Sequence, residues 1–185
     1  MEKKIVWIAS NFKTFCAFFW ILTSYHVKAQ VEPPTIMPGL AATYSTKLEV
    51  TGINARLYYA ADHHYCFGPE VSFFKKDTEE GELSLFEANA NLHYILDLKK
   101  GLGVYPLGGF NYTTETETKD LNETEEKHTE NAFGLNIGAG MHYASGRILF
   151  FGEYKYVVSE LDDHFISVGA LINFSLAKKE KEIPH

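Results

Sequence analysis

The chain has 185 residues, of which 15% are aromatic and 14 are glycine. This length suits one domain, and a mean hydropathy of -0.17 excludes a polytopic helical membrane protein, which would need several runs of about 20 apolar residues. The formal net charge of -7 argues against a nucleic acid partner, because phosphate binding needs a basic surface. Abundant glycine and aromatic residues favour β-structure.

Residues 1–29 have the pattern of a secretory signal peptide that is removed on export. Two lysines lie near the start, an apolar stretch covers residues 15–22, and residues 27–29 resemble the small-residue cleavage site. A transmembrane anchor is the alternative, but the apolar stretch is short for spanning. The mature chain then keeps Cys66 as its single cysteine, so no internal disulfide can form. A short proline-containing lead is expected at 30–37.

Period-two alternation of apolar and polar residues dominates the mature chain and predicts β-strands. The predicted strands lie at 39–47, 50–61, 64–75, 83–97, 101–114, 131–144, 147–158 and 164–176.

One face of these strands is apolar, and the other collects charges of both signs together with glycine and asparagine. Balanced charges and small residues suit a crowded polar interior, where buried charges must pair. The predicted interior charge network consists of Arg56, Glu70, Glu87, Arg147, Glu153 and Lys155. The opposite orientation stays open as an alternative: a soluble exported barrel of lipocalin type, with its apolar faces inward around an apolar ligand.

The connections between the predicted strands alternate in length. Tight turns are expected at 61–64, 97–101 and 144–147, and longer polar links at 75–83 and 114–131. Short turns at one end and longer loops at the other are typical of outer-membrane barrels.

The last predicted strand ends in a polar-x-Gly-x-x-apolar-x-aromatic pattern. Its four positions are Ser167, Gly169, Ile172 and Phe174. This pattern resembles the assembly signal in the last strand of bacterial outer-membrane barrels, and residues 38–176 resemble the small eight-stranded barrels of the OmpA/OmpX and opacity-protein type. One departure is that the chain continues beyond Phe174; we interpret 177–185 as a charged periplasmic tail.

The resemblance implies an all-β fold, an eight-stranded antiparallel up-and-down transmembrane β-barrel. It also implies export through the inner membrane, insertion by the barrel-assembly machinery, and residence in the lipid of the outer membrane. Eight strands leave an interior just wide enough for side chains, so we expect a polar plug and no general diffusion pore. A narrow or gated channel remains an alternative. Aromatic side chains near strand ends, Tyr58 among them, are predicted to form interfacial girdles.

Residues 115–130 are predicted to form an acidic extracellular loop. Its carboxylates are Glu115, Glu117, Asp120, Glu123, Glu125, Glu126 and Glu130. Such a segment is usually solvated and mobile. Its functional interpretation is contact with an unidentified extracellular partner, or with divalent cations held between the acidic groups, although the spacing is not that of an EF-hand.

No pattern in the sequence predicts catalysis, a cofactor or a metal. The histidines lack metal-ligand spacing, and no glycine-rich phosphate loop opens a helix. Ser145, Ser167, His142 and Glu153 could serve a lipid-modifying enzyme, but nothing marks them as a set. The sequence therefore predicts a monomeric, non-catalytic outer-membrane barrel with a structural or cell-surface interaction role.

Overall fold

The computed structural model describes residues 33–79, 81–98, 101–121 and 124–176. The predicted signal peptide, 1–29, and the predicted tail, 177–185, lie outside the described residues. Among the residues described, no helix is long and apolar enough to cross a membrane.

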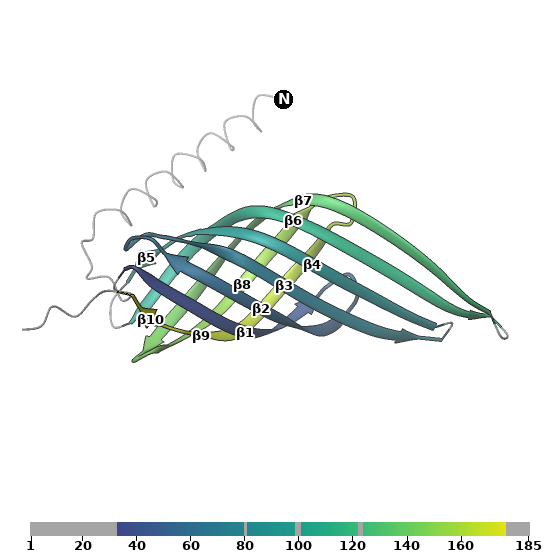
Figure 1. Cartoon of the computed structure of the whole chain (residues 1–185), viewed down its shortest axis with the longest axis horizontal. Coiled ribbons are helices and arrows are strands. Elements are labelled where there is room, and N and C mark those ends of the chain that lie inside the picture. Colours follow the sequence, from purple (N-terminus) through teal and green to yellow (C-terminus); the bar gives the residue numbers. More distant parts are fainter. Residues whose placement is uncertain (1–32, 80, 99–100, 122–123, 177–185) are drawn as a thin grey trace, which may run out of the picture.

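Eight long strands form one closed antiparallel sheet (Figure 1). They are β1 (Thr35–Ser45), β2 (Val50–Ala60), β3 (Tyr65–Thr78), β4 (Gly81–Tyr94), β6 (Leu102–Leu121), β7 (Thr124–Ser145), β8 (Ile148–Val158) and β9 (Asp163–Ile172). Two short strands complete it: β5 (Leu96–Asp97) pairs with β6, and β10 (Phe174–Ser175) pairs with β1. Each long strand pairs with the next, and β1 pairs with β9 to close the barrel. The prediction of an all-β, eight-stranded antiparallel barrel is confirmed.

The two ends of the barrel differ. Both ends of the described chain lie at one end, which we call the terminal end; at the opposite, distal end the β3–β4 and β6–β7 hairpins extend beyond the other strands (Figure 1). The Asp62 carboxylate stabilises one terminal-end turn, since Oδ1 accepts hydrogen bonds at 2.7 Å from the backbone N–H groups of His64 and Tyr65. These two donors lower the pKa of Asp62 below its ordinary value.

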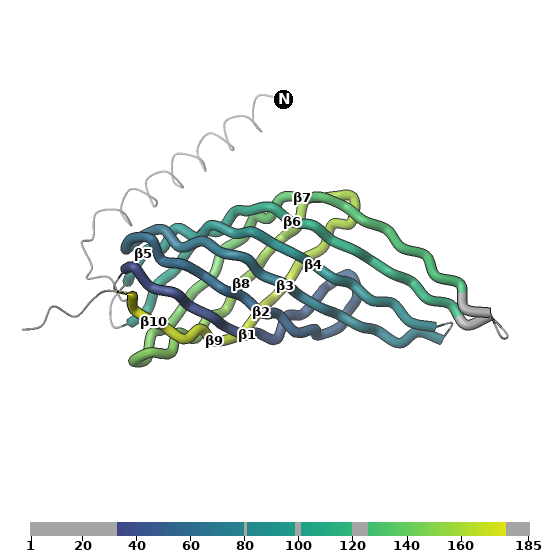
Figure 2. Tube along the Cα trace, viewed as in Figure 1, coloured from purple at the N-terminus to yellow at the C-terminus, as the bar shows by residue number. Residues whose placement is uncertain are grey.

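The predicted acidic loop is wrong in its secondary structure, because residues 115–121 and 124–130 continue β6 and β7 as a paired hairpin (Figure 2). Threonines alternate with charged residues here, and β-branched side chains favour strands. The Thr116 and Thr129 hydroxyls lie 3.3 Å apart across the hairpin, and the Thr114 hydroxyl donates to Asn131 Oδ1 at 2.8 Å.

Two other boundaries also differ from the prediction. Strands β3 and β4 run through most of the expected link at 75–83. Strand β1 begins at Thr35 and pairs with the end of β2, so residues 35–37 of the predicted lead belong to the barrel. In each case the strand is longer than predicted, because backbone pairing with a neighbouring strand continues where the alternation of apolar and polar residues weakens.

Apolar side chains face outward. Phe133 is 83% exposed, Phe110 72% and Ile53 71%, and they belong to a surface of exposed large apolar residues over all eight long strands. Water would not tolerate so much apolar surface, whereas lipid would. The soluble, lipocalin-like alternative, which requires apolar faces inward, is therefore wrong.

The lumen has apolar layers at both ends, where the sequence predicted a uniformly polar plug. The terminal-end layer contains Met37, Ala41, Tyr58, Ala60, Cys66, Leu149, Phe151 and Leu171. The distal layer contains Leu48, Phe74, Leu85, Val157 and Phe165. Tyr58 is only 1% exposed, so its predicted place in an outer girdle is wrong. The charged residues Arg56, Glu70, Glu87, Glu153 and Lys155 lie between the two layers.

Candidate functional site

Five of the six residues of the predicted interior network are buried in the lumen. They are Arg56, Glu70, Glu87, Glu153 and Lys155. The sixth is a correction: Arg147 is exposed in the turn between β7 and β8. The preceding Gly146 has a φ of 61°, so the chain reverses there. The period-two alternation that assigned Arg147 to the interior starts only at Ile148.

Arg56 lies between two carboxylates that come from opposite sides of the barrel. Its Nη1 atom is 3.4 Å from Glu70 Oε1 on β3 and 3.4 Å from Glu153 Oε1 on β8. Its Nε donates to Asn54 Oδ1 at 2.7 Å, and its guanidinium lies 4.3 Å from the centroid of the Phe151 ring. One buried cation therefore serves two buried anions.

Two tyrosines and a histidine surround this group. The Tyr58 hydroxyl donates to Glu70 Oε1 and lies 3.0 Å from His93 Nε2. The Tyr105 hydroxyl donates to Glu153 Oε2 at 3.0 Å, and its ring stacks on that of His93 with centroids 4.6 Å apart. Sequence reasoning did not include these residues in the charge network. Alternation places Tyr58 on the same face as Arg56, which is the signal that could have found it.

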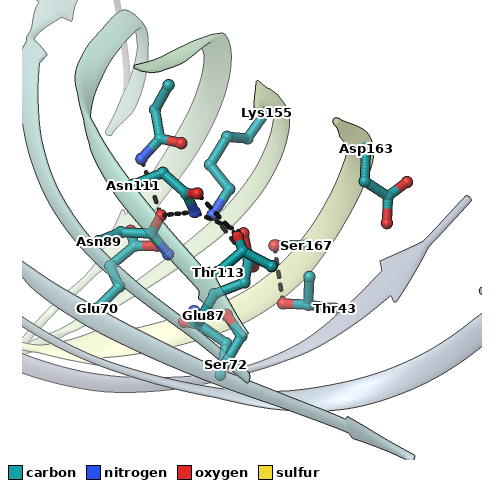
Figure 3. A network of polar contacts seen from close by, with 12 residues as sticks. Thr43, Glu70, Ser72, Glu87, Asn89, Asn111, Thr113, Lys155, Asp163 and Ser167 are labelled. Carbon is teal, nitrogen blue, oxygen red and sulfur yellow. Dashed lines mark hydrogen bonds and ion pairs between the residues drawn. The ribbon is translucent and has the colours of Figure 1, made fainter. Parts of the chain in front are cut away.

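A second charge pair lies nearer the distal end (Figure 3). Lys155 Nζ is 3.5 Å from Glu87 Oε2. Asn111 Nδ2 donates to Glu87 Oε1 at 3.0 Å and to Asn89 Oδ1 at 2.8 Å, and the Thr113 hydroxyl donates to Asn111 Oδ1 at 2.8 Å. These bonds satisfy part of the polar groups directed into the narrow lumen; among the described residues, buried atoms such as Asn89 Nδ2 and Arg56 Nη2 have no hydrogen-bond partner.

Glu70, His93 and Glu153 could in principle hold a metal ion, since one ligand atom from each lies within 4.8 Å of the others. Arg56, however, is 3.4 Å from both carboxylates and already compensates part of their charge. The three residues therefore have the donor atoms of a metal site, but the Arg56 guanidinium already occupies the position of the cation, so the group is an ion-pair cluster.

The residues weighed for a lipid-modifying enzyme do not meet at the lipid interface. Ser145 is exposed at the end of β7, whereas Ser167, His142 and Glu153 are buried in the lumen. The Ser167 hydroxyl lies 2.9 Å from that of Thr43. No nucleophile, base and acid from this group come together.

The distal hairpin of β6 and β7 has two different faces. Alternation puts carboxylates on the face that continues the lumen wall: Glu115 and Glu117 from β6, and Glu126 and Glu130 from β7. We call this the acidic inner face. Glu115 stands directly opposite Glu130 in the register, an unfavourable like-charge pair. Glu123 and the side chains of Asp120 and Glu125 lie outside the described part of the hairpin.

Basic groups lie against three of the four carboxylates of this face. Lys47 Nζ is 2.9 Å from Glu115 Oε2, Lys119 Nζ is 3.2 Å from Glu117 Oε1, and His128 Nε2 is 3.1 Å from Glu130 Oε1. The outer edge of β7 is also open: pairing with β8 begins only at Leu135, so in the described register residues 124–133 have a neighbouring strand on one side alone. Such an edge presents backbone donors and acceptors.

The predicted assembly signal lies along the seam that closes the barrel. Ser167 pairs with Thr43 and Gly169 with Ala41. A Cβ on Gly169 would lie 2.3 Å from the Leu40 carbonyl oxygen, so β1 can approach only because this residue is glycine. Ile172 and Phe174 are about half exposed on the outer surface.

Comparison with known proteins gives a family and a fold. The profile described as the outer membrane protein beta-barrel domain matches residues 23–174. The sequence matches none of the curated proteins.

Solved structures with a similar fold include three outer-membrane proteins. A major outer membrane protein from Thermus thermophilus is 12% identical, with 76% of this chain and 99% of that chain covered and a TM-score of 0.63. Ail of Yersinia pestis, in complex with the heparin analogue sucrose octasulfate, is 12% identical over 76% and 97%, with a TM-score of 0.56. The N-terminal barrel domain of OprF from Pseudomonas aeruginosa is 13% identical over 76% and 98%, with a TM-score of 0.55.

Proposed function

Because the chain belongs to the outer membrane protein beta-barrel domain family, we propose that it is a non-catalytic barrel that acts at the cell surface through the acidic inner face of the β6–β7 hairpin. Residence in the outer membrane follows from the family. The observation that carries the proposal is the projection of this hairpin, as paired strands, beyond the distal end of β1, β2, β8 and β9 (Figure 1).

Orientation in the membrane puts this hairpin outside the cell. Barrels of this kind have short periplasmic turns and longer extracellular connections, and an even strand number keeps both chain ends in the periplasm. The terminal end is therefore periplasmic and the distal end extracellular. The hairpin is held in shape by backbone pairing, which makes it a more ordered contact surface than the mobile loop that the composition indicated.

The charge of the hairpin favours a cationic partner. Glu117, Glu126 and Glu130 are exposed, and Lys119 and His128 are the nearby basic groups on the same face. Ail was solved with sucrose octasulfate, which is an anion. An anionic ligand of that kind would be repelled by this face.

Binding of a lysine-rich peptide to the barrel in bilayer nanodiscs tests the proposal. Glu117→Gln combined with Glu126→Gln removes two charges from the acidic inner face. Glu49→Gln combined with Glu160→Gln is the matched control, since it removes two exposed charges from other connections at the same end. We expect the wild-type barrel to bind the peptide much more weakly at raised salt. Of the two variants, only the hairpin variant should bind the peptide more weakly than the wild type. Equal binding by both variants would contradict the proposal.

The lumen supports a plug and disfavours the channel alternative. Arg56 is held by Glu70 and Glu153, Lys155 by Glu87, and an apolar layer packs inside the lumen toward each end. We expect no stable conductance steps from the wild-type barrel in planar bilayers; regular steps would favour a narrow or gated channel instead.

Assembly is proposed to begin at the last strand, by recognition of Ser167, Gly169, Ile172 and Phe174. Two features support this: the pattern itself, and the exposure of Phe174, which is 52% and thus free to contact a partner before lipid surrounds it. Phe174→Ala should lower the fraction of the protein that reaches the membrane as a heat-modifiable barrel, whereas Phe133→Ala, another exposed phenylalanine, should not.

A further inference from the structure

The buried charges of the lumen do not balance. Three carboxylates, Glu70, Glu87 and Glu153, lie with two cations, Arg56 and Lys155. The exposed fraction of each of these side chains is 4% or less. With neutral histidines, the described middle of the lumen therefore carries one negative charge in excess.

The excess can be localised. Lys155 and Glu87 form a pair of opposite charges at 3.5 Å. Arg56, by contrast, is shared by Glu70 and Glu153, so this group of three has a net charge of -1. Moving an uncompensated carboxylate out of water is strongly unfavourable, and buried groups in this position usually gain a positive charge or become neutral.

The polar atoms around the two carboxylates are close enough together to bind a shared proton. The Tyr58 hydroxyl joins Glu70 to His93 Nε2, and His93 Nε2 lies 3.8 Å from Glu153 Oε2. The Tyr105 hydroxyl donates to that same Glu153 oxygen at 3.0 Å.

Titratable or charged groups face the cluster from six of the eight long strands. They are Arg56 and Tyr58 from β2, Glu70 from β3, Glu87 and His93 from β4, Tyr105 from β6, His142 from β7, and Glu153 and Lys155 from β8. Asp97 of β5 adds a carboxylate on the terminal side, with its Oδ1 3.9 Å from His142 Nε2. Strands β1 and β9 contribute the neutral Thr43 and Ser167 at this level, bonded to each other at 2.9 Å.

A proton fits this cluster better than a metal ion does. A divalent ion beside Arg56 would turn the net charge of -1 into +1, and it would lie close to a guanidinium that is already 3.4 Å from both carboxylates. A proton supplies one positive charge, occupies no volume and leaves Arg56 in place.

We propose that the folded barrel binds one extra proton in the cluster of Glu70, His93 and Glu153, and that its stability therefore depends on pH. In the unfolded chain at neutral pH, glutamates are ionised and histidines are mostly neutral. The folded barrel then holds one proton more than the unfolded chain, so its stability falls as the pH rises.

Reversible unfolding of the full barrel in lipid bilayers, followed between about pH 7 and pH 9, tests this inference. The ratio of folded to unfolded protein should fall with rising pH, at a limiting slope of about tenfold per pH unit. In Glu153→Gln, Arg56 and Glu70 remain as a balanced pair, so this dependence should disappear. Glu70→Gln makes the same charge change on another strand and replaces Glu153→Gln where that variant does not fold.

Tyr105→Phe is the matched control. It removes the hydrogen bond to Glu153 but no charge, so its pH dependence should be that of the wild type. A wild-type stability that is constant over this range, or a dependence that persists in both glutamine variants, would overturn the proposal. So would a loss of stability on adding a chelator at constant pH, because the compensating charge would then be a metal ion.

Discussion

The lumen and the distal hairpin contain similar residues in opposite circumstances. In the lumen, Glu153 and Glu87 are buried and each lies within 3.5 Å of a cation. On the hairpin, Glu117 and Glu126 are exposed, and the ion pair of Glu117 with Lys119, at 3.2 Å, is open to water. A buried carboxylate must be compensated within the protein, whereas an exposed one is hydrated and free to attract a partner. In this account, glutamate therefore stabilises the barrel in the lumen and binds a cationic partner on the hairpin.

The largest expected effect is the loss of the lumen cation that serves two anions. Arg56→Gln leaves Glu70 and Glu153 buried without their shared partner, and breaking a buried ion pair costs about 3–5 kcal/mol. Urea unfolding in lipid vesicles measures the change. Lys119→Gln, which removes an exposed cation from the hairpin, serves as the control and should alter stability by less than about 0.5 kcal/mol.

A smaller effect is expected from crowding the lumen without changing its charge. A Cβ on Gly140 would lie 2.4 Å from Cζ of Tyr105, so Gly140→Val must displace the ring and its bond to Glu153. Overpacking of this kind costs about 1–3 kcal/mol. Gly152→Ala, where a Cβ would meet nothing within 4 Å, provides the comparison in the same unfolding experiment; equal losses would mean that Tyr105 is not held tightly.

Neutralising the acidic inner face should affect binding rather than folding. Glu117→Gln with Glu126→Gln is expected to change the free energy of unfolding by less than about 0.5 kcal/mol, while the lysine-rich peptide loses affinity. A marked loss of stability in this variant would remove the distinction between the two regions.

The smallest effect belongs to the terminal-end turn. Asp62→Ala removes the acceptor of two backbone hydrogen bonds from an exposed turn and should cost no more than about 1 kcal/mol. Since the folded barrel lowers the pKa of Asp62, this contribution is present above the ordinary carboxyl value of about 4 and is lost as the pH falls below it. The difference between wild type and variant should therefore vanish in acid.

Alternation within single strands made most of the barrel predictable. It located all eight long strands and directed Glu70, Glu87 and Glu153 inward. It failed at the ends of strands. The run of glutamates in 115–130 indicated a loop because charge outweighed the alternating threonines. Arg147 was placed inside because the predicted strand began at 147, one residue before β8 begins at Ile148.

The composition of each lumen layer could not be predicted in the same way. Leu149 and Phe151 occupy the face that the sequence identified as polar, and they meet Met37 and Leu171 across the barrel. Which residues share a layer depends on the register between neighbouring strands, such as β8 with β9, and β9 with β1, which lies far away in sequence. A single strand pattern contains no information on that register.

One experiment tests the contrast between the two regions most directly: stability and peptide binding measured side by side for Glu87→Gln and Glu117→Gln. We predict that Glu87→Gln, which leaves Lys155 without its carboxylate, loses about 3–5 kcal/mol of stability, while its folded fraction binds the lysine-rich peptide as the wild type does. Glu117→Gln should bind more weakly at unchanged stability. The account is contradicted if Glu87→Gln is as stable as the wild type, or if Glu117→Gln loses as much stability as Glu87→Gln. In either case the lumen glutamates and the hairpin glutamates would not have the separate roles of stabilising the barrel and binding the peptide.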